Sequence, residues 1–142
     1  MADLLSRPSA PDESGCIQRI TPQSAGWEYV GFEVYQLKRG QVLEQETADQ
    51  EVCLVLVTGK ADVKTAESEW SNLGERMSIF HQKAPYSVYV PPKDGYRVTA
   101  TTDLELAVCK APAKGEYPAR VITPADCQYE TRGVGTNQRH VC

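Results

Sequence analysis

The sequence predicts an all-β protein, a sandwich or small barrel of jelly-roll type, folded as a single domain. Short runs rich in β-branched and aromatic residues follow one another, and turn-forming residues separate them at intervals typical of such folds. No window of helical length repeats its apolar residues with the helical period of about 3.6. The chain has 142 residues, 41% hydrophobic and 24% charged, which fits one ordinary globular domain.

The expected strands follow from these runs and from the breakers between them. Gly40, Gly59 and the pair Pro91 and Pro92 mark turns, because glycine adopts positive φ and proline cannot donate to a strand ladder. One short helical turn is expected at residues 123–126, where Pro124 suits the first helical position. Strands are expected at residues 16–21, 29–37, 41–47, 51–58, 61–65, 77–80, 87–90, 96–101 and 104–111.

Alternation of apolar and polar residues predicts the two faces of some of these strands. In the run 29–37, Phe32 and Val34 alternate with Glu33 and Tyr35, which indicates an apolar face and a polar face. The run 87–90 alternates in the same way, with valines at positions 88 and 90. Such alternation is typical of strands that turn one face toward a core.

Charge and composition argue against several classes of function. The net charge is −4 at pH 7 and the basic residues are scattered, so the chain offers no basic patch for nucleic acid. The longest apolar stretch, residues 52–57, is far shorter than the roughly 18 residues that a membrane-spanning helix needs. The first residues have neither the basic start nor the apolar core of a secretory signal, so the expected location is cytoplasmic.

The cysteines and histidines predict free thiols and no metal site in this chain. The five cysteines are an odd number and form no CxxC motif, so reduced thiols are expected. Cys53 and Cys109 lie within apolar runs, where cysteine behaves as a small hydrophobic residue. The two histidines are too few for a site built from several histidines.

Two stretches resemble the conserved motifs of the cupin barrels. Residues 51–63, EVCLVLVTGKADV, resemble the end of the first motif, and residues 88–100, VYVPPKDGYRVTA, resemble the second. Together with residues 25–37, 73–80, 104–113 and 132–141, they resemble one family, the 5-deoxy-glucuronate isomerases of myo-inositol catabolism. This family is related to the ketol-isomerases of pectin-derived uronates, and the resemblance implies a cupin-type jelly roll.

Members of that family are two-cupin chains, and the resemblance covers the N-terminal cupin. The turn-forming residues Pro8, Pro11 and Gly15 indicate an ordered arm or loose tail at residues 1–14. The resemblance implies a cupin-like barrel at 15–113 and a segment at 114–142 leading to a second cupin that this sequence lacks. It also implies that the intact protein isomerises 5-deoxy-glucuronate to 5-dehydro-2-deoxy-gluconate, an aldose–ketose conversion, with a divalent metal in the C-terminal cupin. The expected partners are that second cupin or a copy of the chain, and a uronate-type sugar acid.

The chain departs from the metal-binding cupin pattern at three places. That pattern places HxH ahead of a glutamate, but residues 44–49 contain no histidine. The histidine position of the second motif is Tyr96, and the interval from Glu51 to Gly59 is longer than usual. A non-catalytic, structural half is therefore expected. The alternative is a stand-alone cupin without metal that binds a sugar or serves as a scaffold.

Five residues are the candidates for a pocket, each with an ordinary structural alternative. Glu51 could act as a general base or cap a strand end, and His81 could move protons or lie in a loop at the barrel mouth. Tyr89 and Tyr96 could bind a sugar or pack within the sheet. Arg97 could hold a carboxylate or form a surface ion pair. Further candidates of the same kinds are Arg76, Tyr86 and His140.

Overall fold

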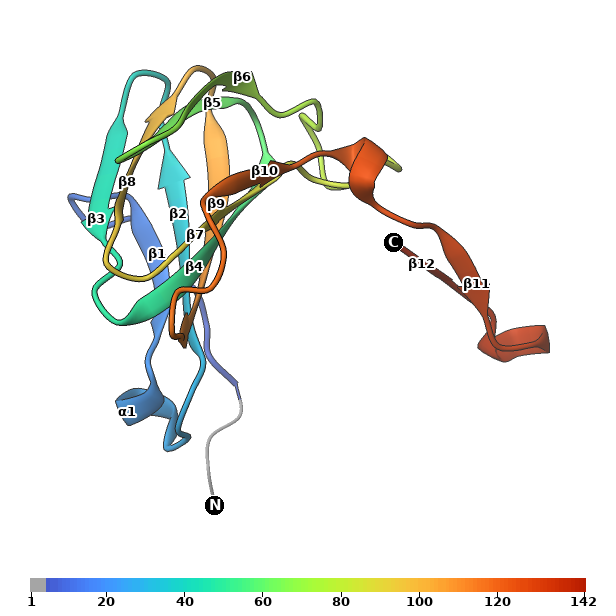
Figure 1. Cartoon of the computed structure of the whole chain (residues 1–142). Helices are drawn as coiled ribbons and strands as arrows, with labels where there is room; N and C mark the ends of the chain where they lie inside the picture. Colours follow the sequence, from blue (N-terminus) through green and yellow to red (C-terminus); the bar gives the residue numbers. More distant parts are fainter. Residues whose placement is uncertain (1–4) are drawn as a thin grey trace.

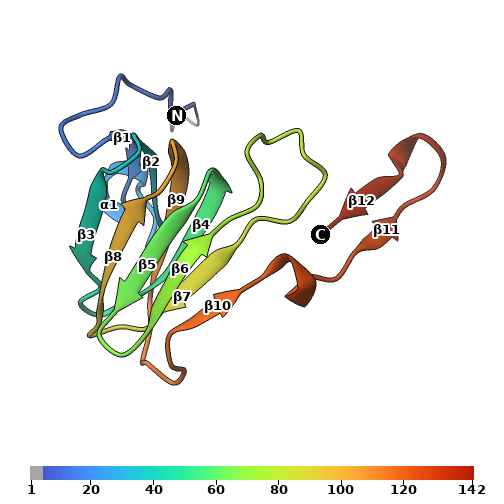
Figure 2. The same ribbon diagram turned by 90° about the horizontal axis from the view of Figure 1, so that it is seen from above.

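The computed structural model describes residues 5–142 and shows two β-sheets packed as a sandwich (Figures 1 and 2). The larger sheet contains β1 (Cys16–Ile20), β2 (Gly31–Leu37), β4 (Gln50–Thr58), β7 (Ser87–Val90), β9 (Leu104–Pro112) and β10 (Arg120–Ile122). The smaller contains β3 (Val42–Glu46), β5 (Ala61–Thr65), β6 (Glu69–Leu73) and β8 (Gly95–Ala100). Their orders are β1-β2-β9-β4-β7-β10 and β3-β8-β5-β6, with antiparallel pairing. The all-β jelly-roll prediction is confirmed.

The core lies between the two sheets and is built mainly from alternating strand positions. On β4, Leu54 and Leu56 are almost completely buried, and on β7 Val88 and Val90 are buried as alternation predicts. Val98 of β8 meets them from the smaller sheet in the same core cluster. Full burial of one such side chain stabilises the fold by about 1.5–3 kcal/mol, so this layer holds the sheets together.

The helical segments are short. The turn expected at 123–126 is confirmed as a 3-10 helix, Pro124–Asp126. The sequence interpretation missed α1 (Pro22–Ala25), in which Thr21 and Ser24 cap each other's backbone N–H groups and Gly26 ends the helix. Within the described residues, no helix is both long enough and apolar enough to span a membrane.

The strand expected at residues 77–80 is wrong, and β6 was not expected. Residues 77–80 belong to the loop between β6 and β7, in which Met77 and Phe80 are 50% and 86% exposed. The guanidinium of Arg76 donates to the carbonyl oxygens of Val57 and Lys83, which fixes the start of this loop. Apolar composition makes a strand only where a neighbouring strand offers hydrogen bonds, and β6 supplies the edge pairing with β5 instead.

The face assignment for residues 29–37 is also wrong. Glu33 and Tyr35 point into the sandwich, with 8% and 0% exposure, whereas Phe32 and Val34 lie on the opposite face of β2. A carboxylate can lie in the interior when a nearby cation compensates its charge. Lys110 does this for Glu33, and other polar groups add hydrogen bonds.

After β10, the chain leaves the sandwich and forms a separate hairpin of β11 (Glu130–Arg132) and β12 (Arg139–Val141), joined by the 3-10 turn Gly135–Asn137. Figures 1 and 2 show this hairpin, which we call the C-terminal arm, extending away from both sheets. All five cysteines are free thiols, as expected.

We predict that Gly59→Ala destabilises the fold far more than Gly40→Ala does. Both glycines have positive φ, +95° and +87°, but a Cβ at Gly59 would lie 2.2 Å from the carbonyl oxygen of Asp103, whereas nothing lies within 4 Å at Gly40. Gly40→Ala should cost about 1 kcal/mol of unfolding free energy from backbone strain. Gly59→Ala should cost more than about 2 kcal/mol by urea unfolding, since backbone must also move. Equal losses of unfolding free energy in the two variants would contradict the close approach of Asp103 to Gly59.

Candidate functional site

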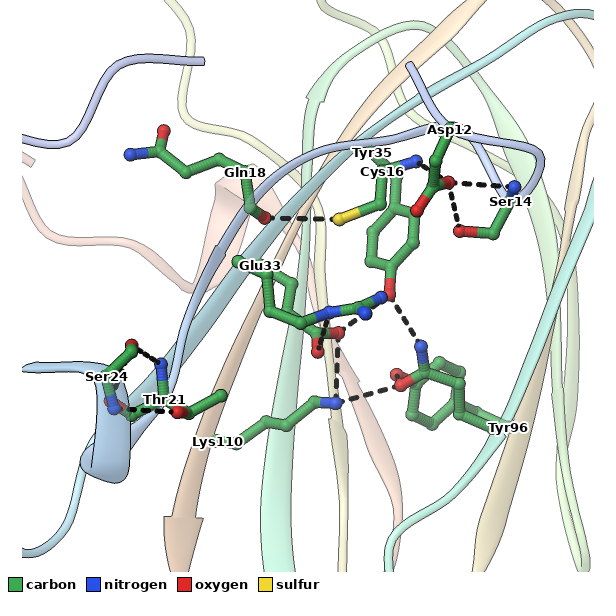
Figure 3. Close-up of polar contacts among 12 residues, drawn as sticks. Asp12, Ser14, Cys16, Gln18, Thr21, Ser24, Glu33, Tyr35, Tyr96 and Lys110 are labelled. Carbon is green, nitrogen blue, oxygen red and sulfur yellow. Dashed lines mark hydrogen bonds and ion pairs between the residues drawn. The ribbon is translucent and has the colours of Figure 1, made fainter. Parts of the chain in front are cut away.

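A cluster of polar side chains lies in the interior of the sandwich, next to the hydrophobic core, and its members are joined by hydrogen bonds (Figure 3). We call it the interior polar cluster. Its members come from both sheets: Arg19 of β1, Glu33 and Tyr35 of β2, Gln45 of β3, Tyr96 of β8 and Lys110 of β9.

The carboxylate of Glu33 is the centre of this cluster. Its Oε2 accepts a hydrogen bond of 2.7 Å from the Tyr35 hydroxyl and lies 3.0 Å from Lys110 Nζ. Its Oε1 accepts from Arg19 Nε at 3.1 Å. These contacts join β1, β2 and β9 of the larger sheet through a single charged group.

The amide of Gln45 connects that centre to the smaller sheet. Its Nε2 donates to the Tyr35 hydroxyl at 2.7 Å, and its Oε1 accepts from the Tyr96 hydroxyl at 2.7 Å and from Lys110 Nζ at 2.9 Å. In the described part of the chain, the buried side-chain polar atom left without a partner is Thr101 Oγ1, which lies outside the cluster. The members of the interior polar cluster thus satisfy one another's hydrogen bonds, with Arg19 half exposed at its edge.

The cluster keeps its carboxyl group ionised and its phenols protonated at neutral pH. Burial by itself would raise the pKa of Glu33, but the Tyr35 hydroxyl and the charges of Lys110 and Arg19 outweigh it, so this pKa is lowered. Burial raises the pKa of Tyr35 to about 12, and it also raises the pKa of Tyr96. Two cations therefore share one carboxylate, which leaves a net positive charge. A hollow of about 280 Å³ opens beside Glu33 and Lys110.

The residues of this interior do not fit a divalent metal. Among residues 5–142, no three or more His, Cys, Asp or Glu side chains gather closely enough to hold a metal ion. The positions that face inward carry the amide of Gln45 and the phenol of Tyr96, and the amide oxygen already accepts two hydrogen bonds.

The structure does not bring the predicted pocket residues together. Tyr96 lies in the interior polar cluster, but Glu51 and Tyr89 lie on the outer face of the larger sheet, where the Tyr89 hydroxyl donates to Glu51 at 3.1 Å. Arg97 forms an ion pair of 2.5 Å with Glu44 on the outer face of the smaller sheet.

The remaining candidates lie near the C-terminal arm. His81, His140 and Arg76 line one open groove of about 730 Å³ between the β6–β7 loop and the arm. The Nδ1 of His140 lies 3.1 Å from Thr131 Oγ1. Tyr86, also in that loop, donates to Glu75 at 3.1 Å.

Sequence reasoning missed most of the interior polar cluster, although a signal for two of its members exists. Glu33 and Lys110 are charged residues within otherwise apolar strands, GFEVY and LAVCKA. A charge at such a position is stable only with a partner, so an opposite pair of this kind indicates an internal contact.

Comparison with known proteins decides the family. The KduI/IolB family model matches residues 4–142. The chain belongs to the KduI/IolB family. It is 54% identical over 141 residues to a 5-deoxy-glucuronate isomerase of Geobacillus thermodenitrificans, covering 99% of this chain and 52% of that protein. It is 33% identical over 144 residues to a 5-deoxy-glucuronate isomerase of Bacillus subtilis, covering 99% of this chain and 53% of the relative. This KduI/IolB chain spans about half the length of these relatives.

Solved structures agree on the family and the fold. An IolB-like protein from Salmonella typhimurium superposes with a TM-score of 0.92 at 52% identity, covering 98% of this chain and 52% of that one. A cupin protein from Bacteroides fragilis matches with a TM-score of 0.53 at 11% identity, covering 82% of this chain and 87% of that one, which shows the fold alone. The cupin-type jelly roll predicted for this KduI/IolB family member is confirmed.

We predict that Glu33→Gln lowers the free energy of unfolding by about 3 kcal/mol at pH 7, because it leaves the largely buried Lys110 without its counter-charge; the half-exposed Arg19 contributes less. The lowered pKa of Glu33 means that its contribution is present above the unfolded carboxyl pKa, near 4.5, and is lost as the pH falls through the folded value. Urea unfolding at several pH values measures both effects.

Glu44→Gln is the matched control, since Glu44 forms its ion pair with Arg97 on the exposed face, where such pairs contribute less than about 1 kcal/mol. If the two variants lose equal stability at pH 7, or if the loss in Glu33→Gln persists unchanged at the lowest pH, the interior polar cluster does not hold a charged carboxylate.

Proposed function

We propose that this chain is the N-terminal, non-catalytic cupin half of a 5-deoxy-glucuronate isomerase. The observation that supports this best is the interior polar cluster, in which the groups facing inward form hydrogen bonds with one another. Under this proposal the whole protein isomerises 5-deoxy-glucuronate, the activity that the names of its relatives state for those proteins. The proposed product is 5-dehydro-2-deoxy-gluconate, and the proposed location is the cytoplasm.

The chemistry of the reaction argues against catalysis by this half. An aldose–ketose isomerisation moves a proton between adjacent carbons, which requires a base poised near neutral pH and an electrophile for the developing oxyanion. The lowered pKa of Glu33 makes it a weak base, and the raised pKa values of Tyr35 and Tyr96 keep those phenols protonated. Lys110 and Arg19 both form ion pairs with Glu33. A divalent metal in the second cupin would supply the electrophile.

The C-terminal arm and the β6–β7 loop are the proposed contact surface for that second cupin. Phe80 of the loop is 86% exposed, and Tyr129 and Val134 of the arm are 63% and 86% exposed. Tyr129 lines the groove between the loop and the arm, and Phe80 and Val134 are exposed elsewhere on the same two segments. Exposed large apolar side chains of this kind are typical of a surface that another domain covers.

The alternative, a stand-alone module that binds a sugar acid, has one observation in its favour. The interior polar cluster carries a net positive charge, and Lys110 borders the hollow of about 280 Å³ together with Thr21 and Gln50. A cation beside neutral hydrogen-bonding groups suits a uronate carboxylate and its hydroxyls.

We predict that purified residues 1–142 show no turnover of 5-deoxy-glucuronate, while the full-length Bacillus subtilis relative serves as the active control. Loss of a bound electrophile removes several kcal/mol of transition-state stabilisation, and each 1.36 kcal/mol is about tenfold in rate. Metal analysis after dialysis should find no stoichiometric zinc, iron or manganese.

Turnover by residues 1–142 that is lost in His81→Ala or Glu51→Ala would contradict the proposal. Calorimetric titration with glucuronate distinguishes the alternative from the proposal. If residues 1–142 bind glucuronate without turnover, and Lys110→Met abolishes this binding, the sugar-acid module is favoured.

A further inference from the structure

Two of the free cysteines, Cys127 and Cys142, lie at the two ends of the C-terminal arm. Cys127 directly follows the 3-10 helix Pro124–Asp126, and Cys142 directly follows β12. The register pairs Val141 with Glu130, so the hairpin brings Cys142 back beside the start of the arm. Figures 1 and 2 both show the end of the chain, marked C, near that 3-10 helix and away from the far turn of the hairpin.

The thiol groups of these two cysteines are neighbours. The Cys127 thiol lies within hydrogen-bonding reach of the Cys142 thiol, and its Sγ lies 3.7 Å from the carbonyl oxygen of Thr123. Both cysteines line the open groove between the β6–β7 loop and the arm. Cys142 is exposed and Cys127 is partly exposed, so a small oxidant in solution can reach both sulfur atoms.

Cys53 and Cys109 form a second pair, but the sheet holds them too far apart for a disulfide. They lie opposite each other in β4 and β9. Leu56 donates its N–H to the carbonyl oxygen of Tyr86 on the β7 side, and peptide groups point to alternate sides along a strand, so those of Cys53 point toward β9. A hydrogen-bonded pair of this kind keeps its Cβ atoms about 5.5 Å apart, whereas a disulfide needs about 3.5–4.5 Å.

The C-terminal arm, in contrast, can adjust its backbone to the geometry of a disulfide. Its two strands have three residues each, and most of their side chains are exposed. A two-stranded hairpin of this size is only marginally stable by itself. The hydroxyl of Tyr129 accepts a hydrogen bond of 3.3 Å from the N–H of Ala84, which joins the start of the arm to the β6–β7 loop. A covalent bond between the two ends of the arm would therefore restrict a segment that has little packing of its own.

We propose that Cys127 and Cys142 form a disulfide bond under mild oxidation by a hydroperoxide, which closes the C-terminal arm into a covalent ring and fixes it. Peroxide oxidises the exposed Cys142 thiol to a sulfenic acid and leaves as water; the Cys127 sulfur then attacks the Cys142 sulfur, and a second water leaves. One peroxide is thus reduced while two thiols lose their hydrogens. Thiol reductants reverse the bond, because exposed disulfides are the easily reduced, regulatory ones. The proposal does not rest on the function proposed above.

Oxidation of purified residues 1–142 with equimolar hydrogen peroxide tests the bond. After alkylation of the remaining thiols, a non-reducing trypsin digest should contain peptide 121–132 joined to peptide 140–142. Cys127→Ser should lack this product and keep a sulfenic acid at Cys142 that dimedone traps, while the matched control Cys109→Ser should form the product as fast as the wild type. A disulfide between any other two cysteines, or a bond that forms only between two copies of the chain, overturns the proposal.

Limited trypsin digestion of the folded chain measures whether the bond fixes the arm. Arg132 and Arg139 are exposed and lie within the proposed ring. Cleavage after them should become several-fold slower on oxidation and return to its first rate with dithiothreitol, whereas in Cys127→Ser peroxide should leave the rate unchanged. Equal cleavage rates in the oxidised and reduced wild-type chain overturn the proposal, and so does an equal slowing in Cys127→Ser.

Discussion

The interior of this cupin depends on the buried carboxylate of Glu33 and on the groups that compensate its charge. Lys110 and Arg19 balance it, Tyr35 donates to it, and Gln45 joins that group to the smaller sheet. An ionised group in a protein interior is stable only when its partners are placed with good geometry. The interior polar cluster therefore fixes how β2, β9 and β3 lie relative to one another, in addition to the apolar core.

The same arrangement is the basis of the proposal that this chain serves structure rather than catalysis. Catalytic groups need a pKa near the working pH, and they must be able to reach the substrate. In the interior polar cluster the carboxyl pKa is lowered, the phenol pKa values are raised, and the hydrogen-bonding groups are used by one another.

Local signals made the positions of most strands along the chain predictable, and long-range contacts made the site unpredictable. Gly59 and the Pro91–Pro92 pair act on their own neighbours, so the turns around them could be predicted from residue type. The inward orientation of Glu33 depends on Lys110, which is far away in the sequence and adjacent only through the pairing of β2 with β9. Residues 77–80 looked like a strand by composition, but strand formation also requires a free edge beside them. Tyr96 was recognised as a departure from the metal pattern, while its partner Gln45 was not singled out.

A double-mutant cycle between Gln45→Leu and Tyr35→Phe measures most directly whether the interior polar cluster ties the two sheets together. The two side chains share one hydrogen bond of 2.7 Å between β3 and β2. A coupling free energy of unfolding of about 1 kcal/mol or more is predicted, because the bond is buried and continues to Glu33. A coupling near zero, with each single variant costing the same alone and in combination, would contradict the account.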